Sequence, residues 1–137
     1  MPLALLSSPH FLRHVLRLDA LSCAVCGLLQ VLVPGQMSTL LALPVALLTY
    51  SGEFLLLYAA LVAWIASRVP LPRTLVWLLL AGNLAWALGC VLLLVGTGLS
   101  PSTLGTAYVL LQALTVLVMA ELQFVGLRRA APAEPAW

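Results

Sequence analysis

The stretch TLVWLLLAGNLAWALGCVLLLVG, from Thr74 to Gly96, decides the fold class of this chain. It holds no charged residue, and about 20 apolar residues rising ~1.5 Å each cross a hydrocarbon core ~30 Å thick, so we interpret it as a membrane-spanning helix. A stripe of small residues near heptad spacing would let a second helix approach closely. We therefore expect the other spans to assemble around this helix. The stripe is Gly82, Ala85, Gly89 and Gly96.

The composition places the rest of the chain in the membrane as well. Of the 137 residues, 64% are apolar and only 7% are charged, whereas about 25% of the residues of a soluble domain are charged. Six arginines and no lysine do not make the basic surface that nucleic-acid binding needs, so nucleic acid is not a partner. The expected surroundings are a lipid bilayer.

Four spans are predicted, at residues 15–33, 54–68, 74–96 and 106–127, with a short tail at 130–137. A helical start at 9–17 should lie in the headgroups, because its basic residues recur on one helical face. Residues 36–51, which contain Pro44, are either a short helix or re-entrant turn, or the first half of a longer kinked helix. The fold class is an all-α integral membrane protein, one domain with four up-and-down helices.

The arginines predict the orientation of these spans. They fall before the first span, between the second and third, and after the fourth, so four crossings put all of them on one side. By the positive-inside rule that side is cytoplasmic, and both termini should lie there. The three pairs are Arg13 and Arg17, Arg68 and Arg73, and Arg128 and Arg129.

Polar residues share one face of the first span, and this face must look into the bundle because lipid cannot satisfy it. They are Asp19, Cys23, Cys26, Gly27 and Gln30.

Two acids, Asp19 and Glu121, lie within or near the hydrocarbon. Glu121 is roughly 10 Å deep, counted from Arg128, where a charged and lipid-facing carboxylate costs about 2.5 kcal/mol or more. If the first and last helices are neighbours, the two acids would line a cytoplasm-facing polar notch. Such a notch suits a proton or cation relay, or a grip on a ligand headgroup; interhelical hydrogen bonds or pairs with arginine are the structural alternative.

Polar side chains on the third and fourth spans are further candidates for a ligand site. Asn83 and Trp86 adjoin the small stripe, and Gln112 shares a face of the fourth span with Tyr108 while Glu121 points half a turn away. The amides can equally be interhelical hydrogen-bonding groups worth ~0.6 kcal/mol each.

The pair Cys23 and Cys26 places two thiols one helical turn apart, a spacing that suits a soft metal or disulfide exchange as well as simple packing. Together with Ala24, the pair resembles the first span of the mercury-transport family MerC, which implies relay of a soft metal. That family also carries cysteines at its C-terminus, and AAPAEPAW has none.

The whole-chain pattern resembles the DoxX-like four-helix proteins of the bacterial inner membrane. The likeness lies in LALPVALLTYSGEFLLLYAALVAW after the first span, GNLAW in the third, and a Gln-containing fourth span that ends in Arg. It implies a location in the inner membrane, and no catalytic residue can be transferred from this family.

These observations favour a non-enzymatic protein that works by binding, because no nucleotide loop or Ser-His-Asp set is present. It would be an accessory subunit of a membrane complex, a homo-oligomer, or a binder of a lipid-like or quinone-like molecule. A soft-metal transporter that uses Cys23 and Cys26 is the alternative, and a membrane thiol oxidoreductase is a third hypothesis. The sequence identifies no cofactor.

Overall fold

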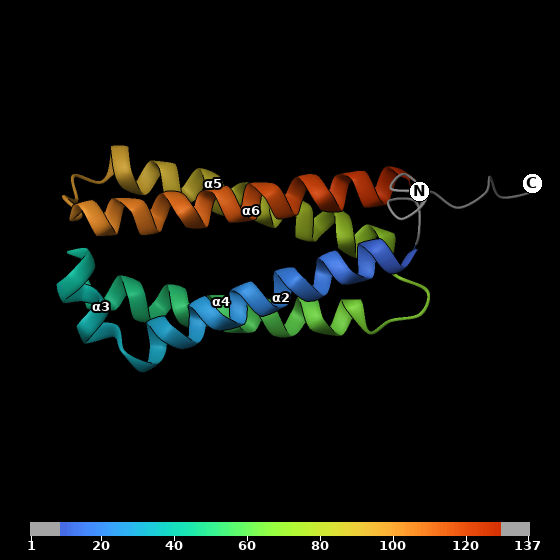
Figure 1. Cartoon of the computed structure of the whole chain (residues 1–137), viewed down its shortest axis with the longest axis horizontal. Coiled ribbons are helices and arrows are strands. Elements are labelled where there is room, and N and C mark those ends of the chain that lie inside the picture. Colours follow the sequence, from blue (N-terminus) through green and yellow to red (C-terminus); the bar gives the residue numbers. More distant parts are fainter. Residues whose placement is uncertain (1–8, 130–137) are drawn as a thin grey trace, which may run out of the picture.

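The computed structural model describes residues 9–129, and within this range the chain forms five α-helices and no strand (Figure 1). The predicted tail at 130–137 lies outside the described residues. The helices are α2 (Pro9–Leu32), α3 (Pro34–Leu41), α4 (Val45–Ala66), α5 (Arg73–Gly96) and α6 (Thr103–Arg129).

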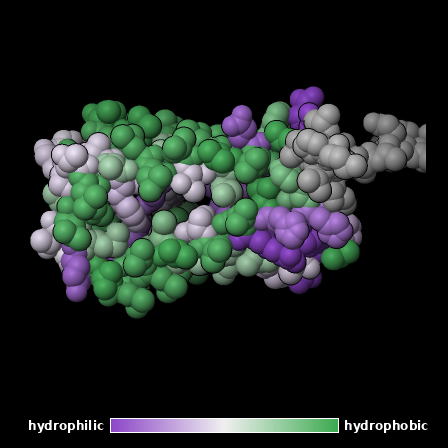
Figure 2. Space-filling model, viewed as in Figure 1, coloured by the Kyte–Doolittle hydropathy of each residue, from purple (hydrophilic) through white to green (hydrophobic). Residues whose placement is uncertain are grey.

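Four of the helices in the described range, all except α3, are long and apolar enough to cross a membrane, with mean hydropathies between 1.7 and 2.3. Their outward faces are apolar as well, and polar residues gather mainly toward the end where α2 begins (Figure 2). The predicted all-α membrane bundle is thereby confirmed, and the chain is a multi-pass membrane protein.

The basic start at 9–17 and the first span form one continuous helix, α2, as their overlapping ranges predict. The segment at 36–51 divides at Pro44: α3 ends at Leu41 and is followed by Ala42, whose φ of 55° is left-handed, and α4 begins directly after Pro44. Proline suits this place because it has no N–H to donate within a helix. The first part is therefore a separate short helix, and the second part belongs to a longer second span.

The long helices form two pairs, and α5 is not the centre of the bundle. Helix α2 packs along α4, α5 packs along α6, and α2 also contacts α6, whereas α4 and α5 scarcely touch although they follow each other in the chain (Figure 1). The tightest crossing of the first pair is at Gly27 and Gly52, where a Cβ on Gly27 would lie 2.8 Å from the Gly52 carbonyl oxygen. Small residues permit this approach of two backbones.

The prediction that a second helix packs closely against the small residues of the third span is wrong. A Cβ on Gly89 or Gly96 would have no atom within 4 Å, and one on Gly82 would meet only the ring of Tyr58, at 3.4 Å. No helix packs against this stripe, because α4 stands away from it. The small residues instead border open space.

All six arginines lie at one end of the bundle, where α2 and α5 begin and α4 and α6 end (Figure 1). Two of them reach across to carbonyl groups at neighbouring helix ends. Arg13 Nη1 donates to Ala66 O and, at 3.0 Å, to Arg68 O, while Arg73 Nη2 donates to Leu127 O at 2.8 Å. These bonds satisfy carbonyls in the last turns of α4 and α6, which have no partner in their own helix, and one in the loop after α4.

Helix α3 closes the opposite end. Ser102, just before α6, donates from its backbone N–H to Leu41 O at 3.0 Å and from its hydroxyl to Leu40 O at 2.8 Å. Gly105 follows on α6 and lies directly against the Leu41 carbonyl group. The end of α3 is thus fastened to the first turn of α6.

Candidate functional site

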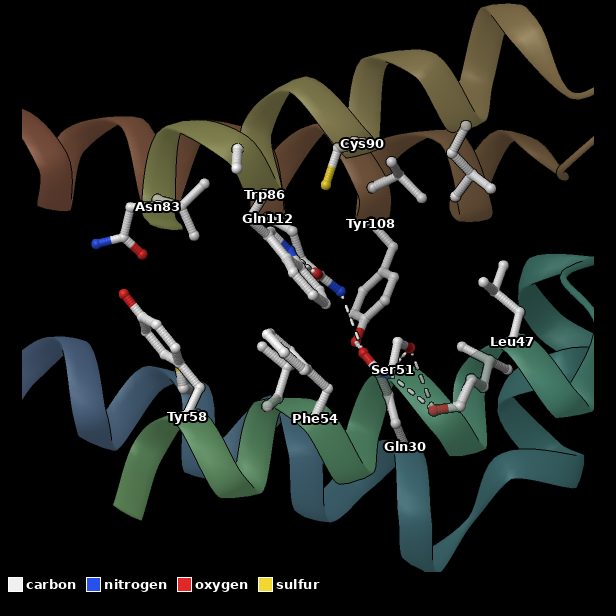
Figure 3. A pocket seen from close by; sticks show the side chains of 18 of the residues that line it. Gln30, Leu47, Ser51, Phe54, Tyr58, Asn83, Trp86, Cys90, Tyr108 and Gln112 are labelled. Atoms are coloured by element: carbon white, nitrogen blue, oxygen red, sulfur yellow. Dashed lines mark hydrogen bonds between the residues drawn. The ribbon is translucent and has the colours of Figure 1, made fainter. Parts of the chain in front are cut away.

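A cavity of about 490 Å³ lies between the two helix pairs (Figures 2 and 3). All four long helices contribute to its lining. On the side between α4 and α5 the lining residues Phe54, Ala85 and Gly89 are exposed, with Phe54 at 53%. Because these helices cross the membrane, the cavity opens sideways toward the hydrocarbon.

Most of the lining is apolar, and the polar groups are few. The larger aliphatic residues are Leu43, Leu47, Leu48, Leu55, Leu93, Val109 and Val116. The residues with side-chain nitrogen or oxygen atoms are Gln30, Ser51, Tyr58, Asn83, Trp86, Tyr108 and Gln112. A mainly apolar cleft of this volume with a small number of placed polar groups is typical of a small-molecule site.

Gln30 organises the polar groups in the half of the cavity nearer α3. Its Nε2 donates to Ser51 Oγ at 2.6 Å and to Leu48 O at 3.0 Å, and its Oε1 accepts from the Tyr108 hydroxyl at 2.6 Å and from Gln112 Nε2 at 3.2 Å. Gln112 Oε1 in turn accepts from Trp86 Nε1 at 3.0 Å. The amide of Gln30 is fully used, so it holds α2, α4 and α6 together.

Asp19 organises a second network toward the arginine end. Its carboxylate is fully buried and accepts at Oδ2 from Gln123 Nε2 at 2.7 Å and from Asn83 Nδ2 at 3.0 Å. The Cys23 thiol donates to Oδ1 at 3.7 Å. Asp19 thus joins α2 to α5 and α6, and two of its partners, Asn83 and Cys23, also line the cavity.

Aromatic rings cross the cavity between α4 and α5. Phe54 stacks on Trp86 with ring centroids 5.6 Å apart and an interplanar angle of 7°, and it also stacks on Tyr58 with ring centroids 6.3 Å apart. Figure 3 shows Phe54 and Trp86 meeting near the middle of the space. The pair thus forms a side-chain contact between the two helices across the cavity.

The structure brings most of the predicted polar residues together. Asn83, Trp86 and Gln112 line the cavity, and Asp19 lies directly behind Asn83. The polar face of the first span does look into the bundle: Asp19, Cys23, Gly27 and Gln30 are all buried.

Glu121 does not belong to this site, and the predicted notch that it would share with Asp19 is wrong. Glu121 is exposed on α6, whereas Gln123, one half-turn along, is fully buried and holds Asp19. The half-turn offset along the fourth span decides the outcome: the face of Gln112 and Gln123 points inward, so Glu121 must point outward.

All three cysteines are free thiols. Cys23 is buried against Asp19, Cys26 is half-buried, and Cys90 is buried on the cavity wall. Within residues 9–129 no group of three or more His, Cys, Asp or Glu side chains is placed to hold a metal ion.

Three cavity residues of α4 were not among the sequence candidates. Ser51, Phe54 and Tyr58 recur at i, i+3 and i+7, the spacing of one helical face. This signal is present in the sequence, but an interpretation that divided the helix near Glu53 obscured it.

Comparisons of the chain with profiles of known protein families, with curated proteins and with solved structures found no match. The function is therefore argued from the cavity itself.

Proposed function

We propose that this protein binds a lipid-like or quinone-like molecule in the cavity between its helix pairs, and that the molecule arrives from the bilayer through the opening between α4 and α5. The observation that carries the proposal is the sideways opening of a mainly apolar cavity, marked by the exposed lining residues Phe54, Ala85 and Gly89.

The size and lining of the cavity support a compact apolar ligand. Its volume of about 490 Å³ lies within the range of sites that enclose drug-sized molecules. The walls are mostly aliphatic and aromatic, and the amide of Gln30 is already saturated by protein partners. A strongly polar solute would find few free partners here and would lose its own hydration, which is costly.

The small stripe of α5 acquires a role in this proposal. Gly82, Ala85 and Gly89 have little or no side chain, so they leave room for a ligand beside α5 where larger residues would fill it. Space is thus reserved for a molecule instead of a helix.

A second candidate function, an accessory subunit of a membrane complex, is favoured by Glu121. This carboxylate is exposed on α6 about 12 Å along the helix from Arg129, at a depth where contact with lipid is costly. A donor or cation from a partner chain would relieve that cost. Copurification of a second chain that Glu121→Leu abolishes would favour this candidate.

We further propose a bacterial inner-membrane location with both termini in the cytoplasm. The support is the gathering of all six arginines at the end of the bundle where α2 begins and α6 ends.

The test of ligand binding places a large side chain in the cavity at a residue where an added Cβ meets no atom within 4 Å. In Gly89→Phe the new side chain has no atom within 4 Å of its Cβ and borders the cavity; Gly96→Phe is a matched control, because that glycine is equally open but does not line the cavity. Each protein is purified gently from its native membranes, and solvent extracts are compared by mass spectrometry.

An apolar molecule should accompany the wild-type protein and Gly96→Phe and be depleted in Gly89→Phe, while all three keep the same thermal unfolding temperature within a few degrees. Equal recovery of the same molecules from Gly89→Phe and the control would refute binding in this cavity.

A further inference from the structure

The side-chain carbonyl oxygen of Asn83 differs from the other polar atoms of its network because it has no hydrogen-bond partner among the described residues. Asn83 is only 2% exposed, and its Nδ2 donates to Asp19 Oδ2 at 3.0 Å and to Gln123 Oε1 at 3.3 Å. Its Oδ1 receives no hydrogen bond from any residue between 9 and 129. In Figure 3 this oxygen points into the space between α5 and α4.

The network behind Asn83 makes this oxygen a good acceptor. An amide whose N–H groups already donate is polarised, and hydrogen bonds along such a chain strengthen one another. Asn83 donates to a carboxylate that is fully buried, in a medium of low dielectric where the effect is larger. The free carbonyl therefore favours a hydrogen-bond donor more than an ordinary amide in water would.

The Tyr58 hydroxyl lies opposite and also offers only lone pairs. Its proton is given to Leu79 O at 2.9 Å, so the hydroxyl oxygen accepts but has no second proton to donate. Figure 3 shows it directed from α4 toward Asn83. The Tyr58 side chain lies beside Gly82, where a Cβ would be in ordinary contact with the hydroxyl oxygen at 3.5 Å. This end of the cavity thus presents two acceptors.

The far end of the cavity has the opposite character. Leu43, Leu47 and Leu93 line it beyond the Gln30 network, near the end that α3 closes. An elongated ligand therefore has one orientation in which both its ends are matched: a polar head beside Asn83 and an apolar tail beside these leucines.

We infer that the ligand carries a neutral hydrogen-bond donor, a hydroxyl or phenolic group, which donates to Asn83 Oδ1 beside the Tyr58 oxygen. This inference rests on the proposed function and narrows its ligand class. A carboxylate or phosphate head is disfavoured, because it would place further acceptor atoms against two acceptors with the Asp19 carboxylate behind them. For a quinone-like ligand, the hydroquinone binds better than the quinone.

The test compares a ligand that has the donor with one in which a methyl group replaces the donated proton. Para-nonylphenol and its methyl ether are titrated into the full-length protein in lipid nanodiscs, and binding is followed by the fluorescence of Trp86 after the other tryptophans, Trp64, Trp77 and Trp137, are changed to Phe. The phenol should bind roughly two- to tenfold tighter than the ether, the effect of one net hydrogen bond.

A variant tests whether Asn83 is the residue that distinguishes the phenol from the ether. Asn83→Leu should bind both ligands about equally, whereas Thr115→Val, a polar-to-apolar change on α6 away from the cavity, should keep the preference for the phenol. Equal affinities in the wild type, or a preference that survives in Asn83→Leu, would overturn the inference.

A third ligand keeps the test decisive if Asn83→Leu fails to fold. Para-nonylacetophenone only accepts hydrogen bonds, so the wild type should bind it no tighter than the ether, and tighter binding would contradict the inference. Failure of all three ligands to bind would instead remove the proposed function, and the inference with it.

Discussion

Gly105 offers the sharpest test of how α3 is held against α6. A Cβ built there would lie 2.0 Å from the Leu41 carbonyl oxygen and 2.9 Å from its carbon, both of them backbone atoms that cannot rotate away. Ordinary van der Waals contact requires the two segments to separate by about 1.4 Å. Gly105→Ala should therefore push the end of α3 off the first turn of α6.

The size of the effect follows from three contributions. Overpacking costs about 1–3 kcal/mol, and loss of the bond from Ser102 N to Leu41 O costs about 0.5–1.5 kcal/mol more. Alanine is favoured over glycine in a helix by about 1 kcal/mol, which offsets part of this cost. The free energy of unfolding should fall by about 2 kcal/mol.

The matched control is Gly89→Ala, where the added Cβ meets nothing within 4 Å and only the helical preference remains. This variant should be neutral or more stable by up to about 1 kcal/mol. Both are measured by equilibrium unfolding in mixed micelles, with helicity followed by circular dichroism. If Gly105→Ala is as stable as Gly89→Ala, the described contact between α3 and α6 is wrong.

Two further predictions concern the buried carboxylate and the orientation. Asp19→Asn should lower the free energy of unfolding by less than about 1 kcal/mol, because one amide oxygen can still accept from Asn83 and Gln123. Asp19→Leu should lower it by roughly 1–3 kcal/mol for each donor that is left unpaired. Equal free energies of unfolding of the two variants would argue against the network. In a background without native cysteines, a membrane-impermeant maleimide added to intact cells should label Ser100→Cys and not Ser67→Cys, and the reverse pattern would contradict the proposed cytoplasmic termini.

The spans and the inward polar face were predictable because they depend on local properties. Length and hydropathy define a membrane helix. A polar side chain such as that of Asp19 or Gln30 must point into the bundle, because lipid offers it no hydrogen-bond partner. The outward direction of Glu121 relative to Gln112 also follows from helical periodicity alone.

The pairing of the helices was not predictable in the same way. Glycine permits close packing but does not require it, so Gly27 and Gly52 at a helix crossing look no different in the sequence from Gly89 beside a cavity. Which role each takes depends on where the partner helix runs. Partner choice for Asp19 was hidden for the same reason: Asn83 and Gln123 reach it only after three helices have packed.

The sideways opening at Phe54 and Gly89 has a consequence for how occupancy would be controlled. A ligand that enters from the bilayer is dissolved in the membrane plane. The fraction of protein that is occupied therefore depends on the mole fraction of the ligand among the lipids, and not on its concentration in water. Diluting a membrane sample with buffer would leave such a complex intact, whereas adding empty lipid would dissociate it. Cells would then regulate occupancy through the ratio of ligand to total lipid.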